Sequence, residues 1–413
     1  MKILFITLIS VDNINERGIY TDLMREFIKN GHYVYVVSPS ERRSKQNTHI
    51  IDENKNCKIL KARIGNIQKT NVFEKGISTL LVEHQFKKAI AKYFSHVQFD
   101  LIIYSTPPVT FSKVVKYIKK RDNAKTYLLL KDIFPQNAVD LGMIGTTGWK
   151  SIIYKYFRNK EKQLYAVSDL IGCMSQANVD YVIKHNPEVD PTKVEICPNC
   201  IEIQDLRLNG KDKLIMRRKY GIPTDKKVFV YGGNLGKPQG IPFIIKCLKS
   251  QESNDDIFFL IVGDGTEFGK LEAYFNEAKP RNMKLMKHLP KDDYDSMIAA
   301  CDIGMIFLDN RFTIPNFPSR LLAYMQVGLP VMACTDPNTD ISKVITEGGF
   351  GWWCQSDSIH SFSLCVEQVC NRNLCVEKGE KARAYLEKYY SAEQTYKKIE
   401  KNINIVKEGE GVI

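Results

Sequence analysis

The chain has 413 residues, enough for about two domains of ordinary size. Its composition is typical of a globular protein, and no run of apolar residues approaches the roughly 18 that a membrane-spanning helix needs. The net charge is +12, and residues 1–200 supply +11 of it, with 30 Lys and Arg against 19 Asp and Glu. This asymmetry predicts an anionic partner for the first half: a phospholipid surface, an acidic substrate or nucleic acid.

The first half alternates predicted strands and helices. Residues 2–8 form a short apolar run typical of a buried strand, and residues 16–29 carry apolar side chains at helical spacing before Gly31. Further strands are predicted over 33–37, 58–63, 100–104, 125–130, 170–174 and 193–197, and further helices over 108–120, 149–166 and 176–185. The alternation predicts a doubly wound α/β domain.

The pattern restarts after a polar connector at residues 201–212. Strands are predicted over 227–231, 258–262, 284–286, 302–308 and 329–334, with helices after Gly240, over 293–300 and from Pro318 to Gly328. From about residue 377 the chain is predicted to be helical and charged. The second half is therefore another doubly wound α/β domain.

A glycine-rich loop, residues 232–240 (GGNLGKPQG), joins the strand 227–231 to a helix. Glycines let backbone amides approach a phosphate closely, so the loop is a candidate diphosphate site, although a tight structural turn is an alternative. Its glycine spacing fits neither the dinucleotide fingerprint nor a P-loop. Lys237, inside the loop, favours the phosphate interpretation.

A second candidate anion site lies where Ser319 is predicted to cap a helix after the strand 302–308. Arg320 falls in the first helical turn, where a cation is poorly placed for the helix dipole. A bound anion would explain it; a solvent-facing arginine is the alternative. Ligands of open parallel sheets bind at the carboxyl ends of strands, where both segments lie.

Four segments of the second half, GGNLGKPQG, FLIVGDGTE, HLPKDDYDSMIAACDIGMIFL and PSRLLAYMQVGLPVMA, together resemble the retaining family 4 glycosyltransferases in order and spacing. The resemblance covers nearly the whole chain and implies the GT-B fold: two Rossmann-like, doubly wound α/β domains facing a central cleft. It implies an acceptor domain at 1–200, a nucleotide-sugar domain at 201–390, and a helix at 391–413 returning to the first domain.

Residues 130–141 (LKDIFPQNAVDL) further resemble the subgroup that adds N-acetylamino-sugars in bacterial surface-polysaccharide assembly, as in capsule and lipopolysaccharide. The resemblance implies a nucleoside-diphosphate sugar donor, usually UDP-linked, and a metal-independent reaction with retention. The implied acceptor is a polyprenyl-linked glycan or oligosaccharide. The implied location is the cytoplasm, peripheral at the inner face of the cell membrane.

The resemblance also assigns the site. It implies donor-binding roles for Gly18, Gly233, Asn234, Leu235, Gly236, Lys237, Gln239, Asp264, His288, Leu289, Ser319 and Arg320. It implies catalytic roles for Asp132, Lys237 and Arg320; for Asp132, a cap of the turn before Pro135 is the alternative. The chain departs from the family at Pro315 and Ala323, where the Glu-x7-Glu signature would place its two carboxylates.

No metal site or cofactor is predicted. Asp293 and Asp295 match the DxD pattern of metal-dependent glycosyl transfer, but they begin a predicted helix and are assigned to capping. Cys197 and Cys200 have redox CxxC spacing without a thioredoxin context, so the eleven cysteines are interpreted as reduced thiols, buried rather than metal-bound.

Rival functions are a non-hydrolysing sugar-nucleotide epimerase of the same fold and a catalytically silent nucleotide-binding partner subunit. The basic first half is compatible with nucleic acid, but no nucleic-acid motif accompanies it, so none is predicted as a partner.

The basic excess of the first half concentrates at residues 86–94, 113–120 and 149–162, among aromatic residues. In the third stretch, an apolar helical face made by Trp149, Ile152, Ile153, Tyr156 and Phe157 is flanked by Lys150, Lys155, Arg158 and Lys162. Such a helix can bind an anionic membrane surface. The alternative is that this face packs on its own sheet.

Overall fold

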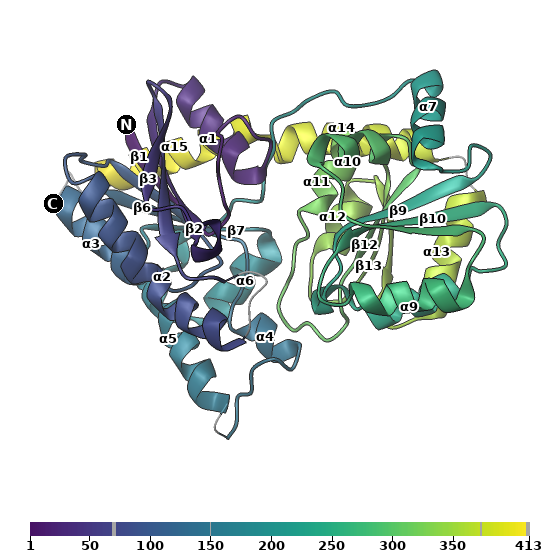
Figure 1. The fold of residues 1–413 in the computed structure, drawn as a ribbon, viewed down its shortest axis with the longest axis horizontal. Coiled ribbons are helices and arrows are strands. Elements are labelled where there is room, and N and C mark those ends of the chain that lie inside the picture. The colour runs from purple at the N-terminus through teal and green to yellow at the C-terminus, as the bar shows by residue number, and fades with distance from the viewer. Residues whose placement is uncertain (68–71, 149, 372–373, 410–413) are drawn as a thin grey trace. The chain divides into compact units, whose positions relative to one another are not determined.

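The computed structural model describes residues 1–67, 72–148, 150–371 and 374–409, with the backbone alone described for 72–73, 75–77, 150, 371 and 407–409; the side chain of Lys150 therefore lies outside the described part. The chain forms two compact units, each a sheet covered by helices on both faces (Figure 1). The first unit comprises Met1–Glu202 and Ala392–Ile413, and the second comprises Ile203–Ser391. No helix of the described residues is both long enough and apolar enough to cross a membrane.

The first unit contains an eight-stranded sheet in the order β3-β4-β2-β1-β5-β6-β7-β8. The strands are β1 (Lys2–Ile6), β2 (Tyr33–Glu41), β3 (His49–Asn54), β4 (Cys57–Ile64), β5 (Leu101–Ser105), β6 (Lys125–Leu130), β7 (Leu170–Cys173) and β8 (Val194–Ile196). All neighbours are parallel except β3, which runs antiparallel to β4. Because β2 and β5 flank β1, the strand order reverses beside β1, and that reversal is where open α/β sheets bind ligands.

Two helical layers cover this sheet. Its helices are α1 (Ile19–Lys29), α2 (Val72–Tyr93), α3 (Ser112–Asp122), α4 (Gln136–Asp140), α5 (Lys150–Val167), α6 (Gln176–His185) and α15 (Ala392–Gly409). α1 and α15 share one hydrophobic core, where the rings of Phe27 and Tyr396 meet edge to face at 4.9 Å. α2, α3 and α5 pack on the opposite core, which contains Phe86, Val115 and Leu164.

The second unit contains a fully parallel six-stranded sheet in the order β11-β10-β9-β12-β13-β14. The strands are β9 (Lys227–Asn234), β10 (Ile257–Asp264), β11 (Met283–Met286), β12 (Ile303–Phe307), β13 (Val331–Thr335) and β14 (Gly351–Gln355). The helices are α7 (Gly210–Tyr220), α8 (Ile241–Lys249), α9 (Phe268–Ala278), α10 (Lys291–Ala299), α11 (Arg320–Gln326), α12 (Ile341–Glu347), α13 (Ile359–Asn371) and α14 (Cys375–Tyr389). Here the order reverses beside β9, so the glycine loop follows the switch-point strand.

The sequence pattern missed elements whose signal is weak. The antiparallel edge strand β3 and the edge strand β14 were not predicted, and neither were α2, α12 and α13. The polar connector is shorter than predicted because α7 begins at Gly210, where the Asn209 side chain accepts a hydrogen bond from the Asp212 amide. β3 has no buried residue, and β14 alternates buried with half-buried residues toward its end, so neither shows the continuous buried run of a central strand.

Candidate functional site

The end of β9 and the loop that follows it are packed tightly against the end of β10 and its loop; β9 extends to Asn234, so the first three residues of the predicted glycine loop belong to the strand. A Cβ on Gly263 would lie 1.9 Å from the Gly233 carbonyl oxygen, and one on Gly265 would lie 2.4 Å from the Leu235 carbonyl oxygen. The Leu235 amide donates to the Asp264 carbonyl at 2.9 Å. The glycines are therefore required by the close approach of two backbones as well as by any ligand.

Within the loop, Gln239 acts as an internal scaffold. Its Oε1 accepts hydrogen bonds from the Gly236 amide at 3.1 Å and from Asn234 Nδ2 at 3.2 Å. The amides of Leu235 and Gly236 are thus already used inside the protein. A bound anion would depend on cationic side chains more than the sequence pattern indicated.

Lys237 and Arg320 are the two predicted cations, and both lie beside this loop. Lys237 is exposed at the start of a 3-10 turn over Lys237–Gln239. Arg320, at the start of α11, donates from Nη1 to the Gly232 carbonyl at 3.0 Å, and its guanidinium lies 4.3 Å from the centre of the Tyr231 ring. The solvent-facing alternative for Arg320 is therefore wrong.

Ser319 occupies the N-cap position of α11, but its side chain makes no capping hydrogen bond, which corrects its predicted capping role. The short α11 is instead fixed by its buried face, where the Tyr324 hydroxyl donates to the Met305 carbonyl at 3.1 Å. The same hydroxyl accepts from the Gly232 amide at 3.1 Å, so α11, β12 and the loop are joined at one point.

The remaining predicted donor residues follow neighbouring strands. Asp264 is exposed and pairs in register with Asn234, and its carboxylate accepts from the Gly265 amide at 2.8 Å. His288 and Leu289 follow β11, two strands away from the glycine loop. The carboxyl edge of the sheet thus carries these residues in the order His288, Asp264, Asn234.

Asp309 is a site-forming residue that the sequence pattern did not single out. Its amide donates to the Pro238 carbonyl at 2.9 Å, which joins the loop after β12 to the glycine loop. Burial raises the pKa of its carboxyl, but hydrogen bonds from Arg311 outweigh this effect and hold the pKa below its ordinary value. The sequence feature that could have identified Asp309 is its position directly after the apolar run that forms β12.

Asp293 and Asp295 are not helix caps, which corrects their predicted role. α10 begins after Pro290, and Asp293 accepts hydrogen bonds from Lys219 Nζ and the Tyr220 hydroxyl, each at 2.9 Å. Asp295 is buried and pairs with Lys291. Across the described residues, no three His, Cys, Asp or Glu side chains are grouped so as to hold a metal ion.

In the first unit, Asp132 follows β6 and is held by a side-chain amide. Asn137 Nδ2 donates to both carboxylate oxygens of Asp132 at 2.7 Å, and Thr106 Oγ1 accepts from the Asp132 amide at 3.2 Å. Burial raises the pKa of Asp132 to about 6. Pro135 is the N-cap position of α4, so Asp132 does not cap that helix, and a cap of the preceding turn remains the alternative for Asp132.

Gly18, also in the first unit, is the last residue before α1. Its amide donates to Asp22 Oδ1 at 2.9 Å, and a Cβ here would lie 3.2 Å from Thr21 Oγ1. Its backbone is extended, so no left-handed conformation requires glycine. The predicted site residues therefore fall into two groups, with Gly18 and Asp132 in the first unit and the others in the second.

Two family descriptions match consecutive parts of the chain. Residues 19–205 match "Glycosyltransferase Family 4", and residues 212–390 match "Glycosyl transferases group 1". The chain belongs to the group 1 and family 4 glycosyltransferases. The predicted family is thereby confirmed, and the two matches correspond closely to the two compact units of this glycosyltransferase.

Curated relatives of this glycosyltransferase include bacterial polysaccharide enzymes. It is 24% identical over 295 residues to the probable glycosyltransferase WbjE of Pseudomonas aeruginosa, covering 71% of each chain. It is 22% identical over 275 residues to the putative colanic acid biosynthesis glycosyl transferase WcaI of Escherichia coli K12, covering 65% of this chain and 66% of that protein.

Solved structures confirm the predicted GT-B fold. HepE of Anabaena, crystallised with UDP, superposes with a TM-score of 0.69 at 14% identity, covering 98% of this chain and 100% of that chain. Sucrose-phosphate synthase of Thermosynechococcus elongatus superposes with a TM-score of 0.77 at 13% identity, covering 99% of both chains.

Proposed function

We propose that this glycosyltransferase moves a sugar from a UDP-linked donor to a lipid-linked glycan acceptor during bacterial surface-polysaccharide assembly, with retention of configuration and without a metal. The observation that carries the donor half is the placement of Arg320 against the Gly232–Gly233 backbone, with Lys237 exposed on the same loop. The crystals of HepE with UDP and with UDP-glucose support the choice of nucleotide.

The chemistry demands stabilisation of the negative charge that develops on the departing diphosphate. Arg320 supplies a planar fork whose orientation is set by the Tyr231 ring and the Gly232 carbonyl, and Lys237 supplies a mobile point charge. A preorganised donor of this kind is worth roughly 3 kcal/mol of barrier. Two cations can stabilise this charge as a metal ion does in metal-dependent enzymes, so turnover should survive EDTA. Loss of turnover in EDTA that Mn²⁺ restores would contradict this part of the proposal.

On the acceptor side, Asp132 carries the proposed role. Its carboxyl is held in one orientation by the two-pronged contact with Asn137 and has a pKa raised to about 6, so it is largely ionised at neutral pH. In that state it can orient an acceptor hydroxyl or stabilise positive charge on the sugar ring. The diphosphate itself then removes the hydroxyl proton as it departs.

An N-acetylamino-sugar is the proposed group transferred. The proposal rests on the resemblance of residues 130–141 to that subgroup, and those residues include Asp132, Asn137 and the helix α4. A further relative, 22% identical over 185 residues, is the N-acetyl-alpha-D-glucosaminyl L-malate synthase of Bacillus anthracis. Thermal-shift screening against UDP-, GDP- and ADP-sugars tests both the nucleotide and the sugar.

A catalytically silent nucleotide-binding subunit is the second candidate, and one observation favours it: Pro315 and Ala323 stand where the family places its carboxylates. Release of UDP that requires an added lipid-linked acceptor supports the transferase. UDP binding without release supports the silent subunit, and UDP release without any acceptor supports an epimerase.

We also propose that the first unit binds an anionic membrane surface through α2, α3 and α5. Most of the apolar face predicted on α5 does not pack on the sheet: Ile152 is 71% exposed, Ile153 43% and Tyr156 39%. Only Phe157 packs inward, against Phe134 with ring centres 4.9 Å apart. The alternative that this face is buried is therefore wrong for three of its residues, while Trp149 lies outside the described residues.

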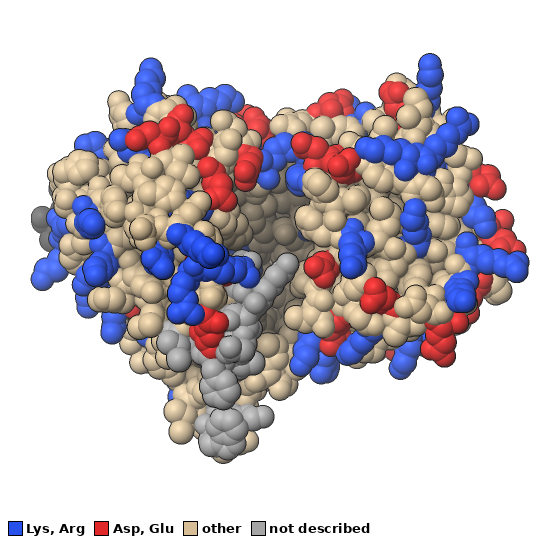
Figure 2. Space-filling view, viewed as in Figure 1, with Lys and Arg blue, Asp and Glu red and all other residues tan. Residues whose placement is uncertain are grey.

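Charge on these helices is segregated in a way that suits a lipid surface. Glu83, Asp122 and Glu161 are buried against Lys160, Arg121 and Arg158 respectively. The lysines Lys88, Lys92, Lys113, Lys116, Lys120, Lys155 and Lys162 are exposed. Figure 2 shows Lys and Arg side chains spread over α2 and α3 with few acidic ones among them. Each exposed lysine near an anionic surface contributes roughly 1 kcal/mol.

Arg158, one of the cations predicted to face lipid, is used inside the protein, which corrects that assignment. Its guanidinium donates to Glu161 at 2.7 Å, to Asn186 Oδ1 at 2.6 Å and to the His185 carbonyl at 2.8 Å. The membrane contact is therefore assigned to Lys113, Lys116 and Lys155.

A further inference from the structure

The loop that follows β1, residues 7–18, is long for a strand-to-helix connection, which typically spans two to six residues. It lies at the switch point of the first sheet, where ligands of α/β sheets bind. Lys61 of β4, almost fully buried, holds its first half by donating to Ser10 Oγ at 2.8 Å and to the Val11 carbonyl at 3.1 Å. Such a long loop with charged restraints is typical of a functional segment.

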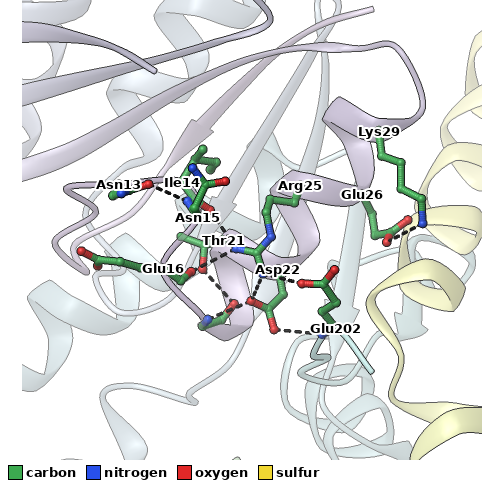
Figure 3. A network of polar contacts seen from close by, with 11 residues as sticks. Asn13, Ile14, Asn15, Glu16, Thr21, Asp22, Arg25, Glu26, Lys29 and Glu202 are labelled. Atoms are coloured by element: carbon green, nitrogen blue, oxygen red, sulfur yellow. Dashed lines mark hydrogen bonds and ion pairs between the residues drawn. The ribbon is translucent and has the colours of Figure 1, made fainter. Parts of the chain in front are cut away.

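The second half of the loop is held by Arg25, which projects from α1 (Figure 3). Its Nη1 donates to the carbonyl oxygens of Ile14 at 2.8 Å and Glu16 at 3.1 Å. Its Nη2 donates to Asp22 Oδ1 at 2.7 Å and to Glu202 Oε2 at 2.8 Å. The Arg25 guanidinium therefore connects three segments: the loop, its own helix α1, and Glu202, where the chain leaves the first unit.

Asp22 completes the bridge as a hydrogen-bond acceptor. It is buried, and its Oδ1 receives the Gly18 amide at 2.9 Å while its Oδ2 receives the Glu202 amide at 2.9 Å. Glu202 is the last residue of the first unit before the chain continues into the second. The preceding carbonyl, that of Ile201, accepts from the Ala392 amide at 2.9 Å, where the chain returns.

From these contacts we infer that Arg25, acting with Asp22, is a positioning residue that couples the loop of residues 7–18 to the segment where the chain leaves the first unit. The inference rests on the proposed function, in which the first unit binds the acceptor. Arg25 suits the task because its fork satisfies four acceptors on three segments, a geometry that the single ammonium of lysine does not reproduce. Lys237 and Arg320, the two cations proposed to bind the diphosphate, lie in the second unit, so the Kd for UDP is expected to change little.

Steady-state transfer kinetics test the inference, with Lys29→Ala as the control. Lys29 is a cation on the same helix, 72% exposed, whose ammonium pairs with Glu26 at 3.4 Å (Figure 3). Arg25→Ala is expected to raise the acceptor KM about tenfold while the Kd for UDP stays within about twofold, and Arg25→Lys is expected to recover part of the loss. Equal acceptor KM values for Arg25→Ala and Lys29→Ala, or a parallel loss of UDP affinity, would overturn it.

A double-mutant cycle tests the coupling itself. Glu202→Gln keeps the backbone bond to Asp22 but removes the ion pair with Arg25. The effects of Arg25→Ala and Glu202→Gln on acceptor KM are expected to be non-additive, and full additivity would show that the two segments are independent.

Amide hydrogen exchange provides a readout that needs no activity. Arg25→Ala is expected to accelerate exchange in residues 8–18 and in 200–205 together, and Lys29→Ala in neither. Acceleration confined to one segment would overturn the coupling. Failure of the unmodified enzyme to transfer sugar would instead contradict the proposed function, while the exchange measurement would still decide the role of Arg25.

Discussion

The loops that follow the switch-point strands of the two units are held by different forces. The loop after β9 is shaped by backbone packing of Gly263 and Gly265 and by one internal amide side chain, Gln239. The loop after β1 is held by two cations, Lys61 and Arg25, that come from elsewhere in the chain. The loop after β9 depends on the absence of side chains at its glycines, whereas the loop after β1 depends on charged side chains. Different substitutions should therefore disrupt the two loops.

The largest effect is expected from adding one methyl group to the backbone-packed loop. Gly263→Ala would place a Cβ 1.9 Å from the Gly233 carbonyl oxygen, so the loop must move. Overpacking typically costs about 1–3 kcal/mol, and if the loop moves out of its binding geometry by that free energy, UDP affinity measured by calorimetry falls up to about a hundredfold. Gly269→Ala in α9 is the control, because a Cβ there meets no atom within 4 Å. Unchanged UDP affinity for Gly263→Ala would show that the loop does not bind the diphosphate.

The next effect concerns two cations: Lys237, which lies on that loop, and Arg320, which lies beside it. Lys237→Ala or Arg320→Ala is expected to weaken UDP binding tenfold or more, since a hydrogen bond to a charged group is worth about 1.5–3 kcal/mol. Lys343→Ala is the comparison, because Lys343, on α12, is 70% exposed and pairs with Glu347. If Lys237→Ala and Arg320→Ala both bind UDP as the unmodified enzyme does, the assignment of the donor site is wrong.

A pH effect of about tenfold is expected in the first unit. Burial raises the pKa of Asp132 to about 6, so ionising this carboxyl in the folded protein costs stability as the pH rises toward 6. Acidification below pH 6 therefore does not weaken the fold through Asp132. It removes the negative charge that is proposed to act in catalysis. The transfer rate is expected to fall about tenfold per pH unit below 6. Asp132→Asn should be slow and flat across this range. A rate for the unmodified enzyme that is constant from pH 5 to 7 would contradict the role of Asp132.

The smallest effect concerns the surface of the first unit. Binding to anionic vesicles is expected to fall between about 0.1 and 0.5 M salt as the Debye length shortens. Changing Lys113, Lys116 and Lys155 together to Glu should abolish co-sedimentation and leave UDP affinity unaltered, because these exposed lysines are the ones proposed to contact the lipid.

The control for this experiment changes Lys246, Lys249 and Lys343 to Glu, which alters the net charge equally but in the second unit. If both triple variants lose vesicle binding to the same extent, the attraction is a property of net charge and the α2, α3 and α5 surface is not a specific contact.

Several features of the candidate site could be predicted because their residues are contiguous. The glycine loop, Lys237 and the segment around Asp132 were found from patterns that lie within about a dozen residues, and the alternating apolar runs predicted both doubly wound units. The CxxC pair likewise proved to be buried thiols, since Cys197 and Cys200 both lie in the core of the first unit.

Features that depend on long-range contacts could not be predicted. Arg25 and Lys61 carry no sequence signal, because their partners are distant along the chain. Lys61 binds the Val11 carbonyl, and Arg25 binds Glu202. The sequence could not show the true partners of Asp293, because only the folded chain brings Lys219 and Tyr220 to its carboxylate. The exposure of Ile152 was likewise undecided, since periodicity marks an apolar face without showing what covers it.

The sequence by itself determined the alternation of strands and helices, the two-unit architecture, the glycosyltransferase family and the loop that carries Lys237, because each is encoded by neighbouring residues. Only the tertiary structure decided that Arg320 lies against that loop, that Arg158 is hydrogen-bonded to Asn186, and that Asp132 is half-buried beside Thr106 with a raised pKa. The physical reason is that hydrogen-bond partners and burial are set by which distant segments pack together, and the charge and orientation of a side chain follow from them.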